Sequence, residues 1–393
     1  MEKIGITPAE EFLDLLYAVL PRDEVLPLHE PNFEGNEGKY VNDCVSSGWV
    51  SSIGKYVDQF ESQLAEYTGA SSVVLVVNGT VALQIALTLA GVKHNEEVIV
   101  PAMSFVATAN AVSHVGAIPN FVDVSKDTLG MCPLKLLDYL KNCTEKTPLG
   151  RRNKNTKRKV SAIVPMHTFG NAVEINKICE IGLEFDIPIV EDAAEALGSF
   201  FENEHLGTFG QVGVLSFNGN KIITTGGGGA LLFKNTDLGA YAKHLTTTAK
   251  VPHPWNFFHD QVGWNYRMPN INAALGCAQL EAIEEKLKKK RILAQKYKEA
   301  FKGSKNFQFF DSKLPSSPNN WLNAAMLTNP CKVVKENVIK ATISNGLGVR
   351  PAWNLLNSLP MYSSCPSDDL DVSEQLFDSI INIPSSSQLV DFE

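Results

Sequence analysis

The chain has 393 residues and a formal net charge of −8, because 43 Asp and Glu outweigh 35 Lys and Arg. This length is too great for one simple hydrophobic core and predicts two domains. Hydrophobic residues make up 44% of the chain and charged residues 20%, which is typical of a soluble globular protein, and the acidic balance argues against a nucleic-acid partner.

The N-terminal residues lack the basic and apolar regions of a signal peptide, and no uncharged apolar run reaches membrane-spanning length. Seven cysteines are scattered without C-x-x-C pairs, as expected of free thiols in a reducing compartment. The eight histidines are equally dispersed. We therefore expect a cytoplasmic protein with no metal site and no membrane partner.

Short apolar runs alternate with helical stretches from about residue 73 to residue 233. This alternation indicates βαβ units and an α/β fold with a mostly parallel seven-stranded sheet flanked by helices. The predicted strands are residues 73–77, 98–101, 119–124, 162–165, 188–191, 212–217 and 230–233. A short helix is predicted over residues 134–141. The basic run at residues 151–159 contains no aromatic residue, so we interpret it as a solvated loop rather than a nucleic-acid site.

The second half of the chain has weaker signals. Residues 273–301 have a helical pattern in which glutamates precede lysines at spacings that allow intrahelical pairs. We expect this helix to lead from a large domain of residues 1–275 into a smaller α+β domain of residues 276–393. That domain is predicted to contain a strand at 321–328, a helix at 334–345, and a strand or loop at 350–353. The aromatic loop at 253–259 would cover a site, stack on a nucleobase or pack at a subunit contact.

One lysine, Lys221, lies between two apolar strands with no other charged residue for several positions on either side. Desolvation of such an ammonium would lower its pKa, as an amine that attacks a carbonyl requires. Ser216 offers a hydroxyl that could hold an anion beside this lysine. The glycines Gly226–Gly229 would let the backbone pass close to a bulky flat group.

Asp192 follows an apolar strand, at the position where open α/β sheets place their ligands. A carboxylate combined with a later lysine meets the needs of pyridoxal phosphate. The lysine forms a Schiff base, and the carboxylate keeps the pyridine nitrogen protonated. A role for Asp192 as a helix cap remains an open alternative.

Two further segments fit the same cofactor. Asn78, Gly79 and Thr80 lead from a strand into a helix, whose first N–H groups and dipole suit a phosphate dianion. Phe105 lies just beyond another strand, where its ring could stack on a cofactor or pack in the core.

In their order and spacing, these segments resemble the pyridoxal-phosphate-dependent sugar aminotransferases of the DegT/StrS type, which have the aspartate-aminotransferase-like fold type I. The resemblance covers nearly the whole chain, from Gly48–Gly54 through His167–Gly170 and Gly263–Met268 to Arg350–Trp353. It implies pyridoxal 5′-phosphate as the cofactor. It also implies a homodimer with the active site at the subunit interface.

The resemblance carries roles over to individual residues. It implies that Lys221 is the Schiff-base lysine and that Asp192 is the partner of the pyridine nitrogen. Gly79, Thr80 and Ser216 match phosphate-binding positions.

Three more positions match residues around the cofactor. Phe105 matches the ring that stacks on it. Asn265 matches a residue that reaches the phosphate from the other subunit. Glu195 stands where many members carry a Gln that contacts the phenolic oxygen of the cofactor, and a carboxylate there would repel the phenolate unless one of them is protonated.

Candidate substrate residues are fewer. His167 lies at a strand end near the expected site, where a catalytic and a structural role are both open. Arg267 and Arg350 are the arginines nearest to the matching motifs, and either could bind glutamate or a diphosphate.

Within the family, the segments Gly48–Gly54, Asn220–Thr225 and Arg350–Leu356 are most similar to the LegC-like branch. This likeness implies UDP-4-keto-6-deoxy-N-acetylhexosamine as the amino acceptor and glutamate as the donor. GDP-linked 4-keto-6-deoxymannose, as in perosamine synthesis, is a close competitor. A sugar dehydratase on the same fold would replace the lysine by histidine, so Lys221 argues against it, whereas a non-catalytic protein of this fold remains an alternative.

Overall fold

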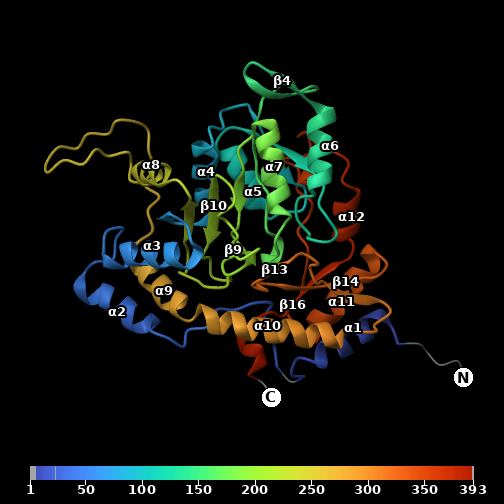
Figure 1. Ribbon diagram of the computed structural model, residues 1–393. Coiled ribbons are helices and arrows are strands. Elements are labelled where there is room, and N and C mark those ends of the chain that lie inside the picture. Colours follow the sequence, from blue (N-terminus) through green and yellow to red (C-terminus); the bar gives the residue numbers. More distant parts are fainter. Residues whose placement is uncertain (1–5, 23, 392–393) are drawn as a thin grey trace, which may run out of the picture.

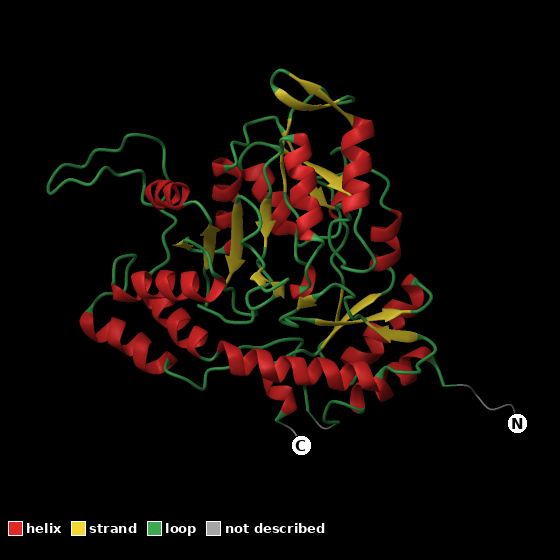
Figure 2. Ribbon diagram, in the orientation of Figure 1, coloured by secondary structure: helices red, strands yellow, loops and turns green. Residues whose placement is uncertain are grey.

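The computed structural model describes residues 6–22 and 24–391, and a seven-stranded sheet lies at its centre (Figures 1 and 2). Its strands are β1 (Ser72–Val76), β2 (Glu97–Pro101), β3 (Ile118–Val122), β6 (Val160–Ile163), β7 (Val190–Asp192), β10 (Val212–Ser216) and β11 (Gly229–Phe233). A parallel bridge between Ile163 and Ile189 joins the part β1-β11-β10-β7 to the part β6-β2-β3. Strand β11 is antiparallel to β1 and β10, and the other pairings are parallel. The predicted mostly parallel sheet is confirmed.

Both faces of this sheet are buried. Along β1, Val73 and Leu75 belong to one hydrophobic core and Val74 and Val76 to the other, because successive side chains of a strand point to opposite faces. The first core is closed by α3 (Lys55–Thr68), α6 (Pro133–Cys143) and α7 (Ile175–Phe185), and the second by α4 (Gly79–Leu89), α5 (Val106–His114) and α8 (Thr236–Thr246). Strands buried on both faces are continuous apolar runs, which explains why the sequence located them.

The prediction of one long helix over residues 273–301 is wrong. The structure has two helices there, α9 (Asn270–Glu281) and α10 (Ile283–Ala300). Between them Ala282 has φ −98° and ψ 3°, and its N–H donates to the carbonyl of Gln279 at 3.3 Å in place of an α-helical bond. Helix α9 packs on α2 (Glu37–Ser47) and α3, whereas α10 runs on into the C-terminal part (Figure 1). Because of the break, α9 packs in the hydrophobic core of the large sheet and the second half of α10 packs in the C-terminal core.

A smaller antiparallel sheet, in the order β12-β14-β16-β15, forms the C-terminal part. Its strands are β12 (Phe307–Phe309), β14 (Asn323–Leu327), β15 (Arg350–Pro351) and β16 (Ile380–Ile383), and it is accompanied by α1 (Pro8–Tyr17), α11 (Lys332–Ser344) and α12 (Asp371–Phe377). Phe12 of α1 packs against Phe301 and Phe307, with ring centroids 6.0 and 4.8 Å apart. The N-terminal helix thus shares the core of the C-terminal sheet, and the domain boundary at residue 276 stays a prediction.

The prediction of a loop over residues 151–159 is wrong for residues 151–153. These residues belong to a hairpin of β4 (Thr144–Thr147) and β5 (Gly150–Asn153). Opposite charges stabilise this pairing, since Arg152 contacts Glu145 across the strands at 2.8 Å. The remaining short elements are β8 (Phe200–Phe201), β9 (Glu204–His205), β13 (Ser316–Ser317), η1 (Thr168–Gly170), η2 (Leu356–Ser358) and η3 (Ser387–Val390). None of the helices in the described part of the chain is long and apolar enough to cross a membrane.

The contact between α3 and α9 has a direct test. A Cβ added at Gly276 of α9 would lie 2.4 Å from the Phe60 ring of α3, so we expect Gly276→Ala to lower the free energy of unfolding by about 1–3 kcal/mol. Gly38 of α2 has nothing within 4 Å of such a methyl group, and Gly38→Ala should raise stability by up to about 1 kcal/mol through helix propensity. Urea unfolding measures both, and equal midpoints for the two variants would contradict this packing.

Candidate active site

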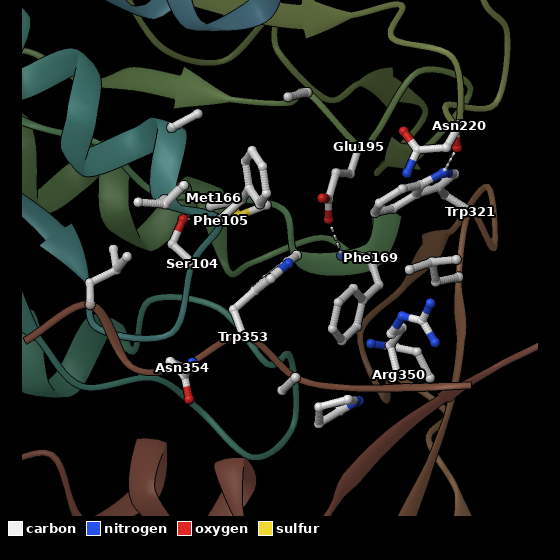
Figure 3. Close-up of a pocket in the computed structure, with 18 of the residues that line it drawn as sticks. Ser104, Phe105, Met166, Phe169, Glu195, Asn220, Trp321, Arg350, Trp353 and Asn354 are labelled. Atoms are coloured by element: carbon white, nitrogen blue, oxygen red, sulfur yellow. Dashed lines mark hydrogen bonds between the residues drawn. The ribbon is translucent and has the colours of Figure 1, made fainter. Parts of the chain in front are cut away.

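A cavity of about 940 Å³ opens where the parallel strands end (Figure 3). Segments that follow β1, β2, β6, β7 and β10 line one side of it, and Trp321, Trp353 and α11 line the other. The predicted site residues that line the cavity are Gly79, Thr80, Phe105, Asp192, Glu195, Ser216, Lys221 and Arg350. The carboxyl ends of the strands bring these residues together, although they are spread over most of the chain.

One end of the cavity is formed by the start of α4. The Asn78 side chain caps this helix by accepting a hydrogen bond from the Val81 N–H at 2.9 Å, while the first N–H groups of a helix have no intrahelical partner. A Cβ at Gly79 would lie 3.0 Å from the Ser216 Cβ, so glycine is needed where α4 meets the end of β10. Thr80 and Ser216, which both carry a hydroxyl group, therefore flank a site suited to an anion.

Asp192 lies buried at the end of β7 and lines the cavity. Its carboxylate accepts hydrogen bonds from the Thr108 hydroxyl at 2.7 Å and from the Ala194 N–H at 3.2 Å. Burial raises the pKa of Asp192 and outweighs the effect of the Thr108 hydrogen bond, which lowers it. The bond to Ala194 closes the turn that follows β7. Within the described residues no helix begins there, since α7 ends at Phe185 and the next helix, α8, begins at Thr236, so the helix-cap alternative for Asp192 is wrong.

The Lys221 amine contacts the Glu195 carboxylate at 3.2 Å and lies 3.9 Å from the centre of the Trp321 ring. Only 12% of the Lys221 side chain is exposed. Trp321 is itself fixed, because its indole N–H donates to the carbonyl of Asn220 at 2.7 Å (Figure 3). The amine is thus held between a carboxylate and an aromatic face.

Glu195 is almost completely buried, and its second carboxylate oxygen accepts a hydrogen bond from the Phe169 N–H at 2.9 Å (Figure 3). Burial raises the pKa of Glu195 to about 7, although the Lys221 ammonium and the Phe169 N–H both lower it. The carboxyl group therefore changes its charge near neutral pH, directly beside the lysine.

An aromatic wall closes the cavity near Phe105, whose side chain is 47% exposed. Trp353 contacts the rings of Phe105 and Phe169, with centroids 6.1 and 5.0 Å apart (Figure 3). Phe169 has a φ of 57°, in the left-handed region, which directs both its N–H and its ring toward the site. Phe169 and Trp353 lie in motifs that carry the family resemblance, but neither was predicted to belong to the site, and nothing in the sequence pointed to Trp321.

Three predicted residues do not line the cavity. His167 is buried behind it, where its Nε2 contacts the Glu191 carboxylate at 3.0 Å and its Nδ1 accepts from the Val173 N–H. Asn265 is exposed in the segment that precedes α9. Arg267 bridges to the end of β1 through its backbone, and within the described residues its buried Nε has no hydrogen-bond partner.

The residues present fit pyridoxal phosphate. Among the described residues, the buried Asp192 carboxyl is hydrogen-bonded to one hydroxyl and one N–H, so it can also accept a hydrogen bond from a ring N–H. The Lys221 amine lies in the same cavity. The start of α4, with the hydroxyls of Thr80 and Ser216, suits a phosphate. Together with the sheet topology, this arrangement defines a pyridoxal-phosphate-dependent aminotransferase of fold type I.

Comparison with known proteins identifies the family. The model of the DegT/DnrJ/EryC1/StrS aminotransferase family matches residues 31–392, so the chain belongs to this family. GDP-perosamine synthase of Vibrio cholerae is 33% identical over 368 residues, which cover 93% of this chain and 95% of that protein. UDP-4-amino-4,6-dideoxy-N-acetyl-beta-L-altrosamine transaminase of Campylobacter jejuni is 27% identical and covers 86% of each chain. The crystal structure of a DegT DnrJ EryC1 StrS aminotransferase from Brucella abortus superposes with a TM-score of 0.81 at 26% identity over 90% of each chain.

The raised pKa of Glu195 makes stability depend on pH. Between its ordinary value of 4.5 and about 7, the folded protein keeps a proton that the unfolded chain loses, so the contribution of Glu195 to stability falls as the pH rises through this window. We expect the unfolding free energy of the wild type to fall relative to Glu195→Gln by up to roughly 3 kcal/mol across it.

Urea unfolding of the cofactor-free protein at steps from about pH 4.5 to 7.5 measures this difference. Exposed Glu184 supplies the matched control, because Glu184→Gln should follow the wild type at every pH. A constant difference between wild type and Glu195→Gln would contradict the assignment.

Proposed function

We propose that the protein transfers an amino group from glutamate to a nucleotide-linked 4-keto-6-deoxy sugar and so produces a 4-amino sugar. The acceptor proposed is UDP-4-keto-6-deoxy-N-acetylhexosamine. The proposal is carried by one observation: Lys221 and Asp192 line a single cavity of about 940 Å³ that also extends well beyond both residues. Membership of a family of sugar aminotransferases supports the sugar substrate.

The strand ends provide the contacts that the cofactor needs. The first N–H groups of α4, with Thr80 and Ser216, would hold its phosphate, and Gly79 leaves room for it. Asp192 would hold the ring nitrogen, and Phe105 would face the ring. When bound, pyridoxal phosphate supplies an electrophilic carbon for amines and a ring that accepts electrons.

Lys221 would act as the acid and base of the reaction. Its amine, freed from the cofactor by the incoming donor, would take the proton from the α-carbon of glutamate. Glu195, 3.2 Å away, can accept or return a proton as its own charge changes near pH 7, and Trp321 keeps the amine beside it. The low exposure of Lys221 limits exchange of that proton with water.

Asp192 would act by its charge. A carboxylate next to the ring nitrogen keeps that nitrogen protonated, which favours electron flow from the α-carbon into the ring. The Thr108 hydrogen bond orients this carboxylate. The nitrogen of glutamate would stay in the site while water supplies the new carbonyl oxygen, so the donor would leave as 2-oxoglutarate before the keto sugar enters and takes up the nitrogen. The reaction would therefore follow ping-pong kinetics.

The same geometry accommodates a second acceptor, GDP-4-keto-6-deoxymannose. Similarity to GDP-perosamine synthase over 93% of the chain supports this alternative. The two acceptors differ in the base and in the substituent at the second carbon of the sugar, and neither difference involves Lys221 or Asp192.

We also propose a homodimer in which Asn265 reaches the cofactor phosphate of the other subunit. The loop after α8 extends from the body of the protein (Figure 1). The exposed side chains of Trp255, Phe257 and Phe258 in this part of the chain support a subunit contact. The seven free cysteines support a reducing compartment, the cytoplasm.

Replacement of Lys221 tests the function. Wild type mixed with pyridoxal phosphate should show a visible absorption band, convert one equivalent of glutamate to 2-oxoglutarate without a sugar, and then aminate the keto sugar. Lys221→Ala should lose the band and lower the amination rate by at least about 10³-fold. Lys234→Ala, at an exposed lysine, is the control. If wild type showed no band that depends on Lys221, the catalytic assignment would fail and a non-catalytic role would take its place. A band that did not respond to glutamate would contradict the proposed donor or reaction type.

A further inference from the structure

The cavity continues beyond the predicted cofactor residues to the beginning of α11. Lys332, Lys335 and Asn382 line this end, with Arg350 of β15 beside them. We call these four residues the α11 lobe. Lys332 and Arg350 are exposed, whereas Lys335 and Asn382 are each only 3% exposed. A ligand that starts at Lys221 can therefore extend into a second, chemically distinct region.

The α11 lobe is positively charged in an acidic protein. It contains three cationic side chains, and the only carboxylate among the described residues that line this end is that of Glu336. Within the described residues, none of the three cations forms an ion pair. Lys335 instead donates to the carbonyl of Phe377, and Arg350 donates to the carbonyl of Val349 at 2.9 Å. Lys335 also lies 4.1 Å from the centre of the Phe377 ring, and burial lowers its pKa, whereas Lys332 and Arg350 are exposed and can contact an anion.

Asn382 points independently to a ligand. It lies on β16 opposite Arg350, and within the described part of the chain its buried Oδ1 has no hydrogen-bond partner. A buried amide without a partner costs free energy, and such groups in native proteins commonly have a partner that is absent from the bare chain. Because Oδ1 is an acceptor, its partner must be a donor, such as a hydroxyl group of a ligand that extends through the cavity, rather than an anionic group.

The backbone adds to the attraction for anions. Helix α11 begins at Lys332 and runs for 13 residues, so its dipole is positive at the cavity. Its N-cap residue, Cys331, makes no side-chain hydrogen bond to the helix, which leaves the first N–H groups available. Exposed Lys332 and Arg350, together with a helix start, suit a group with two negative charges better than a single carboxylate.

We propose that the α11 lobe binds the diphosphate of the nucleotide-linked substrate and so sets the direction in which the sugar reaches Lys221. This inference rests on the proposed function for the identity of the ligand. The other anion that could bind the lobe is a carboxylate of glutamate. Separate measurements of nucleotide binding and of the reaction with glutamate distinguish the two.

Calorimetric titration of the cofactor-loaded protein with UDP, GDP and inorganic pyrophosphate tests the proposal. We expect Lys332→Ala to weaken the binding of UDP or GDP roughly tenfold, and Lys332→Ala with Arg350→Ala to weaken it further. Wild-type affinity should also fall more steeply with added salt than that of the variants. The control is Lys340→Ala, at an exposed lysine of α11 that does not line the cavity.

Glutamate provides the second arm. Lys332→Ala should leave the glutamate concentration needed for half-maximal formation of 2-oxoglutarate unchanged. If that concentration rose while UDP and GDP affinity stayed the same, the lobe would bind the donor carboxylate and the proposal would be overturned. Absence of UDP, GDP and pyrophosphate binding in the wild type would overturn it as well.

Failure of the proposed function has a different signature. If Lys332→Ala weakened nucleotide binding but the wild type formed no 2-oxoglutarate from glutamate, the diphosphate site would stand and the proposed transfer from glutamate would fall. Thermal unfolding of each variant shows whether it is folded. Because Lys332 and Arg350 are exposed, both replacements should keep the wild-type midpoint.

Discussion

Where the parallel strands end, two carboxyl groups, those of Asp192 and Glu195, line the cavity with one amine, that of Lys221, and the site depends on this imbalance of charge. Lys221 contacts Glu195, so Asp192 is left with the hydrogen bonds of Thr108 and Ala194. Burial opposes the ionisation of both carboxyl groups and raises the pKa of each. A cationic ring nitrogen beside Asp192 would complete the balance. Affinity for such a ring and the unusual titration of Glu195 thus have the same physical origin.

This arrangement requires the C-terminal part as much as the central sheet. Trp321, which covers the Lys221 amine, has its carbonyl held by Lys290. Burial lowers the pKa of Lys290 to about 7, and its amine also binds the carbonyl of Ser385. The Asn319 amide in turn donates to the backbone carbonyl of Glu195 at 2.8 Å. The position of the lysine is therefore set by contacts that converge from segments far apart in the sequence.

The sequence predicted the central sheet well, because strands buried on both faces are continuous apolar runs. It also placed Lys221 and Asp192 near one another, since strand ends meet at one edge of the sheet. It did not predict the break at Ala282, where no Gly or Pro marks the turn. The contact of Trp321 with Lys221 depends on tertiary packing alone. The role of His167 could not be predicted either. A histidine at a strand end has the same sequence pattern whether it pairs with a buried glutamate, as His167 does with Glu191, or faces a ligand.

The packing of Phe12 against Phe301 and Phe307 has a consequence for synthesis on the ribosome. Helix α1 is made before these partners, which emerge only after nearly three hundred further residues. At ordinary elongation rates this takes roughly 15–60 s, during which the apolar face of α1 has no native partner. The central sheet can be completed in that interval, whereas the C-terminal core closes around α1 only later. Nascent chains that stall before residue 301 would expose that face to chaperones.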